Sequence, residues 1–192
     1  SAASDVYKRQ VHKVNEVRVI TDYSYGNQNR KWGDSASFKG YKLYSYDQLA
    51  FRPKAITDAI SIAPGKVFKD IDRTLTYNQI SDLGIFKYPN ITYQTDPRDS
   101  TGTGLIATVL LTPRKKQTLG VDFDAYTSTI QQFGIGFSST FLTRNVFRGA
   151  ETLEISGRGS VGSAKDQDDN ESFFNISEVG GDVKLSFPQI LL

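Results

Sequence analysis

Four groups of residues in this chain have types and spacings that chemistry could use, and each also has a simpler structural explanation. His12, the only histidine, stands beside the start of an expected strand. No Ser-His-Asp arrangement of recognised spacing can be assembled around it. Asp122 and Asp124 share one face of an expected strand and could mimic a catalytic carboxylate pair. A polar strand face explains both aspartates more simply, so we expect no catalytic residues and no enzyme activity.

The other two groups suggest a metal site and a phosphate site. Asp166–Glu171 offers oxygen ligands at the first, third and fifth positions of a calcium loop. It has glutamate where the loop needs glycine, and Ser177 where it needs a bidentate glutamate. Gly157, Gly159 and Gly162 precede neither a helix nor the lysine of a phosphate loop, and glycine in a strand more often permits bending or close approach. We therefore expect a solvated loop, no metal and no cofactor.

Composition narrows the class of protein. The net charge of +2 over 192 residues is too small to indicate nucleic-acid binding. Cysteine is absent, which excludes disulfides, thiol catalysis and thiolate metal sites. The longest apolar stretch, Leu105–Leu111, has the length of a buried strand and is too short for a transmembrane helix.

The segment after residue 115 shows four strand-length stretches in which every second residue is apolar. Successive side chains of a strand point to opposite faces, so each stretch has one apolar and one polar side. In a soluble sandwich the apolar side meets a second sheet, whereas in an outer-membrane barrel it meets lipid. The apolar positions are Leu119, Val121, Phe123 and Ala125, then Phe133, Ile135, Phe137 and Phe141, then Leu153, Ile155 and Val161, and finally Val183, Leu185 and Phe187.

The first half of the chain predicts strands and helices in the order β-α-α-β-β. Leu105–Thr112 is apolar on both faces, which favours an interior strand, whereas Pro89 favours an edge position for the strand before it. Asp70 is expected to cap the second helix and Gly84 to end it. We expect strands at Val11–Ile20, Ile85–Thr95 and Leu105–Thr112, helices at Pro53–Ile60 and Asp70–Leu83, a loop or small hairpin at Thr21–Gly40, and a short strand at Tyr41–Tyr46. The side chains expected to pack on the sheet are Ile56, Ile60, Leu75 and Leu83.

These patterns predict two domains after a short leader. Ser1–Gln10 matches neither a targeting segment nor the pattern that follows, so we expect it to be non-native or disordered. Residues 11–114 form the α+β domain, and residues 115–192 form the alternating strands. Both ends of the chain are expected to be truncated.

Several stretches resemble a known family. Residues 11–113 resemble a POTRA domain through FRPKAITDAISIAPGKVF (51–68), TLTYNQISDLGIFKYPNITYQ (74–94) and VLLTP (109–113). TRNVFRGAETLEISGRG (143–159) and DVKLSFPQ (182–189) resemble the first barrel strands of the same superfamily, in the BamA/TamA-like branch found in Bacteroidota. The resemblance implies an α+β POTRA domain followed by the first antiparallel strands of a transmembrane β-barrel, truncated here.

The resemblance also implies a function in outer-membrane protein assembly, insertion or translocation. POTRA modules receive unfolded client strands, partly by adding them to an exposed sheet edge. The implied client edge contains Tyr88, Thr92 and Gln94. The implied seam of the barrel lies along its first strand, at Leu119, Val121, Phe123 and Ala125. The expected partners are unfolded outer-membrane proteins, accessory periplasmic proteins or lipoproteins, and outer-membrane lipid, with the POTRA domain in the periplasm and without a cofactor or nucleic acid.

Three alternatives stay open at this point. Within the superfamily, the chain could belong to a two-partner secretion transporter or another barrel-fused relative. From another class, it could be a soluble periplasmic or surface adhesion module with a β-sandwich. It could also be the anchor of a hydrolase whose catalytic domain is missing. A gene that continues with further alternating segments of ~10 residues would favour the barrel.

Overall fold

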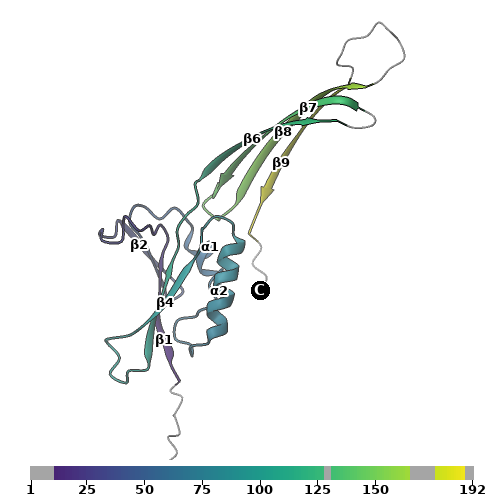
Figure 1. The fold of residues 1–192 in the computed structure, drawn as a ribbon. Coiled ribbons are helices and arrows are strands. Elements are labelled where there is room, and N and C mark those ends of the chain that lie inside the picture. The colour runs from purple at the N-terminus through teal and green to yellow at the C-terminus, as the bar shows by residue number, and fades with distance from the viewer. Residues whose placement is uncertain (1–10, 128–130, 165–175, 189–192) are drawn as a thin grey trace, which may run out of the picture. The chain divides into compact units, whose positions relative to one another are not determined.

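Strand pairing divides the chain into two sheets, which belong to two separate units (Figure 1). The computed structural model describes residues 11–127, 131–164 and 176–188. Unit 1 extends to Arg114 and also includes Arg148–Ala150 and Pro188, whereas unit 2 comprises Lys115–Phe147 and Glu151–Phe187. No helix in the described parts is long and apolar enough to cross a membrane.

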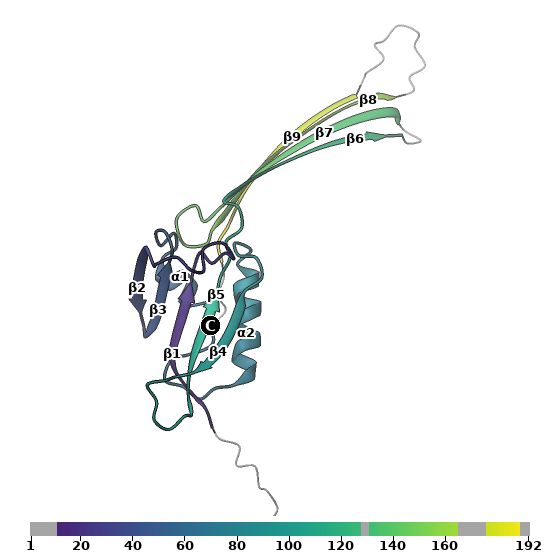
Figure 2. The same cartoon turned by 60° about the vertical axis from the view of Figure 1, so that its left-hand side comes forward.

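Unit 1 is a mixed sheet with two helices on one face (Figure 2). Its elements are β1 (Lys13–Ile20), β2 (Asp34–Phe38), β3 (Tyr41–Ser45), α1 (Pro53–Thr57), α2 (Asp70–Asp82), β4 (Asn90–Thr95) and β5 (Gly104–Leu110). The strand order is β2-β3-β1-β5-β4, in which β1 runs parallel to both β3 and β5. The pairs β2–β3 and β4–β5 are antiparallel. The expected interior position of the doubly apolar strand is confirmed, because β5 has a paired neighbour on each side.

The order of elements differs from the prediction by one hairpin. Strands β2 and β3 stand between β1 and α1. Strand β3 confirms the short strand expected at Tyr41–Tyr46, and β2 lies within Thr21–Gly40, where a loop or small hairpin was expected. They are joined by Lys39 and Gly40, both with positive φ (47° and 85°). Two such residues make the tight turn whose twist suits an antiparallel hairpin, and glycine adopts this conformation without steric cost.

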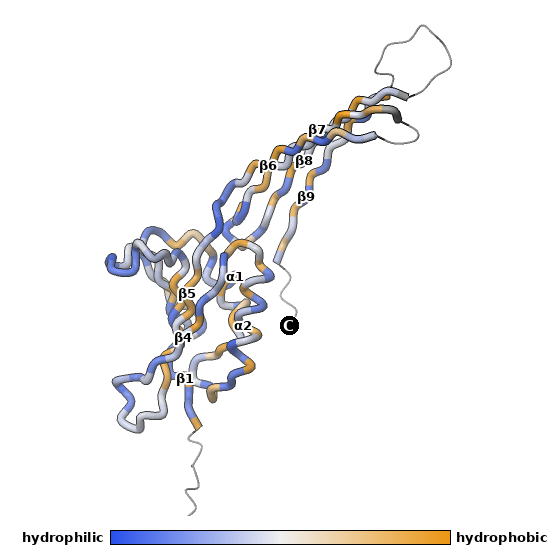
Figure 3. The backbone as a smooth tube through the Cα atoms, in the orientation of Figure 1, coloured by the Kyte–Doolittle hydropathy of each residue, from blue (hydrophilic) through white to orange (hydrophobic). Residues whose placement is uncertain are grey.

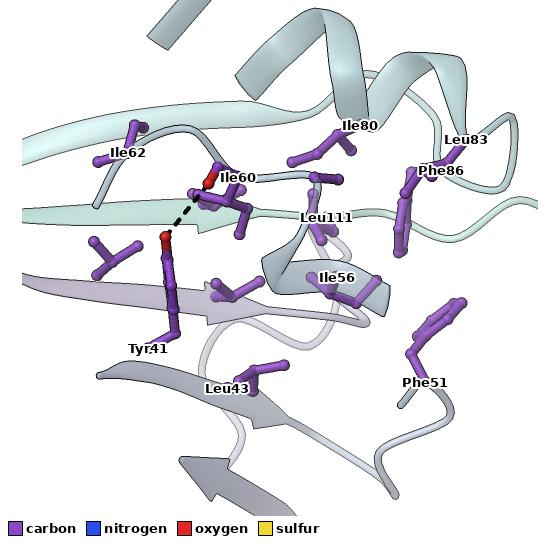
Figure 4. Packing of buried hydrophobic residues seen from close by; sticks show 14 of the residues in the cluster. Tyr41, Leu43, Phe51, Ile56, Ile60, Ile62, Ile80, Leu83, Phe86 and Leu111 are labelled. Atoms are coloured by element: carbon purple, nitrogen blue, oxygen red, sulfur yellow. Dashed lines mark hydrogen bonds between the residues drawn. The ribbon is translucent and has the colours of Figure 1, made fainter. Parts of the chain in front are cut away.

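The core of unit 1 lies between the sheet and the two helices (Figure 4). Ile56 of α1 and Ile80 of α2 are fully buried, and Phe51 packs on Phe86 with ring centroids 5.0 Å apart. The hydroxyl of Tyr41 donates to the Ile60 carbonyl oxygen across 3.3 Å, so this polar group is satisfied inside the core. The sheet contributes Val17, Val19, Leu43, Ala107, Val109 and Leu111.

Several expected boundaries and contacts were wrong. The strand predicted from Ile85 is continuous only from Asn90. Phe86 forms an isolated antiparallel bridge with Pro113, in which the Lys87 amide donates to the Thr112 carbonyl oxygen and the Arg114 amide to the Ile85 carbonyl oxygen. Pro89, which has no amide hydrogen to donate, lies between this bridge and β4. Helix α1 ends at Thr57, and Gly84, at φ 68°, follows the end of α2 as predicted.

Helix α2 differs from the prediction at two residues. Lys69 stands at the N-cap position of α2 and makes no side-chain cap, so Asp70 is the first helical residue instead. As an acidic residue in the first turn, Asp70 still suits the helix dipole. Leu75 is 41% exposed, whereas the other predicted packing residues, Ile56, Ile60 and Leu83, are buried.

Unit 2 is an antiparallel meander with the order β6-β7-β8-β9. Its strands are β6 (Gln117–Tyr126), β7 (Gln131–Arg144), β8 (Thr152–Ala164) and β9 (Ile176–Ser186). All four match the alternating stretches seen in the sequence. Figure 3 shows apolar and polar residues alternating along them.

Candidate functional sites

Strand β4 is an edge of the sheet in unit 1. It pairs with β5 alone, with Thr92 opposite Thr108 and Gln94 opposite Ile106. Ile91 and Tyr93 pack against the core beside α2, so the alternate residues Thr92 and Gln94 lie on the other face and are exposed. No strand among the described residues covers the outer side of β4. The structure thus places two of the predicted client-edge residues on an open edge, while binding of a client stays a prediction.

The third predicted edge residue, Tyr88, lies in the segment immediately before β4. Its side chain is 83% exposed and stands immediately before Pro89. It is therefore near the edge strand in sequence without belonging to the ladder.

A groove between α2 and the start of β4 was not predicted. Its volume is about 270 Å³, and its lining residues are Arg73, Thr74, Tyr77, Pro89, Asn90 and Ile91. Beside it, Tyr93 packs edge-on against Phe68 at a centroid distance of 4.8 Å, and burial raises the pKa of Tyr93 to about 12. The sequence signal for this groove was an arginine and a tyrosine one helical turn apart on α2, which the sequence analysis did not single out.

The opposite end of β4 is held by a buried carboxylate on β1. Glu16 accepts hydrogen bonds from Lys42 Nζ and Arg98 Nη2, each at 2.9 Å, and from Arg18. Burial alone would raise the pKa of Glu16, but these hydrogen bonds outweigh it and lower that pKa to about 2. Arg98 also donates to Asp96 directly after β4, which holds the pKa of Asp96 below its usual range. The cluster therefore stays ionised at neutral pH and fixes the β4–β5 loop.

The remaining candidate residues from the sequence make structural contacts or lie within a strand. The Nδ1 atom of His12 lies 3.2 Å from the Thr103 carbonyl oxygen. Gly157, Gly159 and Gly162 all lie in β8, with no helix after them. Within the described residues, no group of three or more acidic or histidine side chains could hold a metal. The acidic loop Asp166–Glu171 lies outside the described residues.

In unit 2 the pairing register places every charged side chain of the four described strands on one face. Residues in register across the sheet share a face, and even-numbered residues pair with even-numbered ones in β6–β9 except at the register shift where Gln131 pairs with Ala164. The charged residues are Asp122, Asp124, Arg144, Glu154, Arg158, Glu178, Asp182 and Lys184. All have even numbers, so Asp122 and Asp124 belong to a charged, polar face.

The odd-numbered face is apolar and uncovered. Phe123 and Phe137 pack side by side at 5.1 Å, yet Phe123 is 75% exposed and Val179 is 92% exposed. Strand β6 is a free edge of the described sheet, and this face contains the four predicted seam residues, Leu119, Val121, Phe123 and Ala125. Contiguous exposed apolar side chains on one face are typical of a surface that contacts lipid or another protein.

Comparisons with known proteins support the fold. No sequence family matches the chain, and no curated protein matches it. Among solved structures it is similar to CdiB from Acinetobacter baumannii, with a TM-score of 0.50 and 9% identity over 79% of this chain and 23% of that chain. For BamA from Haemophilus ducreyi lacking POTRA domains 1–3, the TM-score is 0.48 and the identity 10%, over 92% of this chain and 28% of that chain. The chain thus spans about a quarter of each structure and shares the CdiB fold over that part.

Proposed function

We propose that this chain is part of an outer-membrane protein that assembles or transports other proteins. In this proposal unit 1 is the POTRA domain nearest the barrel, and unit 2 is the first four strands of the barrel. The sequence stretches that resemble the BamA/TamA-like branch of Bacteroidota and the fold shared with CdiB support this assignment.

The observation that carries the proposal is the separation of charge in unit 2. Eight charged side chains lie on one face of a sheet whose other face is apolar and exposed. Outer-membrane strands alternate in this way, because one side faces lipid and the other a wet interior. A charge on the lipid side would cost about 2–4 kcal/mol at the bilayer midplane, which explains why that side lacks charges.

The proposed mechanism needs no covalent chemistry, catalytic residue or cofactor. Unfolded outer-membrane proteins would add a strand to the open edge of β4, guided by exposed Thr92 and Gln94 and by Tyr88. The free edge of β6, with Leu119 and Phe123 toward lipid, would form one side of the barrel seam near which clients enter the membrane. Accessory periplasmic proteins or lipoproteins and outer-membrane lipid complete the proposed set of partners. Unit 1 would then lie in the periplasm.

The decisive test asks what covers the apolar face. A fluorophore is attached at Val121 or, as a matched control on the opposite face, at Asp122 of the membrane-reconstituted full-length protein. A bilayer-soluble quencher should act at Val121, and a water-soluble quencher should act at Asp122. If neither quencher reaches Val121 and the protein stays soluble without detergent, protein covers this face, and the adhesion module with a β-sandwich replaces the barrel.

The similarity to CdiB favours a second candidate, a two-partner secretion transporter. The two candidates differ in cargo, because such a transporter would export a partner, whereas an insertase would fold clients into the membrane. Photo-crosslinkers at Thr92 in the full-length protein distinguish them. Capture of outer-membrane precursors supports the insertase, and capture of one secreted partner supports the transporter. Crosslinks confined to other parts of unit 1 would remove this edge from either mechanism.

A further inference from the structure

The groove between α2 and β4 lies where side chains of a strand added to β4 would arrive. Residues of β4 alternate between the side that packs toward α2, with Ile91 and Tyr93, and the exposed side, with Thr92. An added strand would alternate in the same way. Every second side chain of that strand would therefore point toward α2 and meet the groove.

The groove combines a space for one apolar side chain with a cation. Its volume of about 270 Å³ exceeds the ~150 Å³ cavity that accommodates a benzene ring. Tyr77, Pro89 and Ile91 supply apolar walls. Arg73 is exposed, and within the described parts of the chain it forms no ion pair. The site is thus complementary to an apolar group next to a negative charge.

The spacing of Arg73 and Tyr77 on α2 matches the spacing of side chains along one side of a strand. Arg73 and Tyr77 are separated by one helical turn, which places their Cβ atoms about 5–6 Å apart on one face of α2. Side chains two residues apart in a strand lie on the same side, separated by about 6.6–6.8 Å. One client strand can therefore place an apolar side chain beside Tyr77 and a carboxylate beside Arg73 at once.

We propose that Arg73 and Tyr77 select client strands that carry an aromatic or large aliphatic residue and, two positions away in either direction, an acidic side chain. This inference rests on the proposed addition of client strands at β4. In strand addition, backbone hydrogen bonds alone would accept any extended chain. The proposed selection adds a preference for certain side chains.

The test uses the whole chain in detergent with a photo-crosslinker at Thr92, on the side of β4 away from the groove. The probes are strand-length peptides of alternating pattern with a central phenylalanine and, two positions away, aspartate, serine or lysine. The aspartate peptides should crosslink about two- to fivefold more efficiently than the lysine peptides, the range expected for an exposed ion pair. Arg73→Glu should reverse this order, whereas Lys66→Glu, a control at an exposed cation outside the groove, should leave it unchanged.

The outcomes separate the two proposals. If peptides crosslink at Thr92 but aspartate, serine and lysine peptides do so equally, the edge binds strands and the preference assigned to Arg73 is wrong. An aspartate preference that survives Arg73→Glu also overturns it. If no peptide crosslinks at Thr92 whatever its sequence, strand addition at β4 fails, and this inference fails with it. Tyr77→Ser should lower capture of the phenylalanine peptides but not of matched alanine peptides.

Discussion

Replacement of Glu16 by glutamine tests how unit 1 holds its open edge. The Glu16 carboxylate is buried on β1 and accepts hydrogen bonds from three cationic side chains, which lower its pKa from 4.5 to about 2. Such a lowering of the Glu16 pKa corresponds to roughly 3 kcal/mol of stability at neutral pH. The side chains of the three partners, Arg18, Lys42 and Arg98, are 41%, 43% and 58% exposed, so water screens them. We therefore expect Glu16→Gln to cost about 1–3 kcal/mol at pH 7.

The stabilisation by the Glu16 carboxylate should depend on pH in a defined direction. Because the folded-state pKa is lowered, the stabilisation is fully present above pH 4.5 and is lost as the pH falls toward 2. The difference between the wild-type chain and Glu16→Gln should therefore shrink by more than half at pH 3. Trp32 is the only tryptophan and belongs to unit 1, so its fluorescence during urea titration reports this unit without unit 2.

A control and a refuting result complete the experiment. Asp47→Asn removes an exposed pair with Arg30 and should change the unfolding free energy by no more than about 1 kcal/mol. If Glu16→Gln lowers the stability equally at pH 7 and pH 3, the loss comes from packing and the electrostatic explanation is wrong. A variant as stable as the wild type at pH 7 would show that the three cations do not stabilise the carboxylate.

Three further predictions concern the core, the apolar face and one loop. Ile60→Ala should cost about 2–5 kcal/mol in urea unfolding, whereas Leu75→Ala, at a half-exposed position, should cost clearly less; equal costs would contradict the observed burial. Val121→Arg should impair assembly of the full-length barrel, measured as heat-modifiable folded protein, far more than Asp122→Arg does, and the reverse order would exchange the two faces. Gly33→Ala should destabilise unit 1 by about 1–3 kcal/mol and shift Trp32 fluorescence, because the added Cβ atom would lie 2.5 and 2.6 Å from two backbone carbonyl oxygens. An unchanged midpoint of urea unfolding would refute this prediction.

In unit 2 the sequence predicted the strands and the faces of their side chains. Alternation along Leu119–Ala125 and its three companion stretches predicted both the strands and their faces, since side-chain direction in a strand depends only on the parity of the residue. The antiparallel order of the four strands was implied by the family resemblance, and the structure shows it as the order β6-β7-β8-β9. The placement of all eight charges on one face needed the register, because each charged residue that is paired across β6–β9 has an even-numbered partner.

In unit 1 the sequence located most elements but not their partners. The doubly apolar character of β5 identified an interior strand, because both of its faces had to be buried. Nothing local could show that β1 lies between β3 and β5 or that Glu16 meets Arg98, 82 residues later. Ile85 and Phe86 looked like the start of a strand, and Phe86 does pair with Pro113, but an interruption that contains Pro89 separates this bridge from β4.

At the candidate site, the sequence predicted the open edge, and the tertiary structure decided the groove beside it. Pro89 and the mixed character of the strand after it predicted an open edge, because proline cannot donate to a neighbouring strand. The groove beside that edge was decided by tertiary structure, which places Arg73 and Tyr77 of α2 next to Ile91 of β4. Leu75, on the same helix, was expected in the core and is half-exposed instead. Helical periodicity gives the faces of α2, but only packing against the sheet decides which face is buried and which stays exposed.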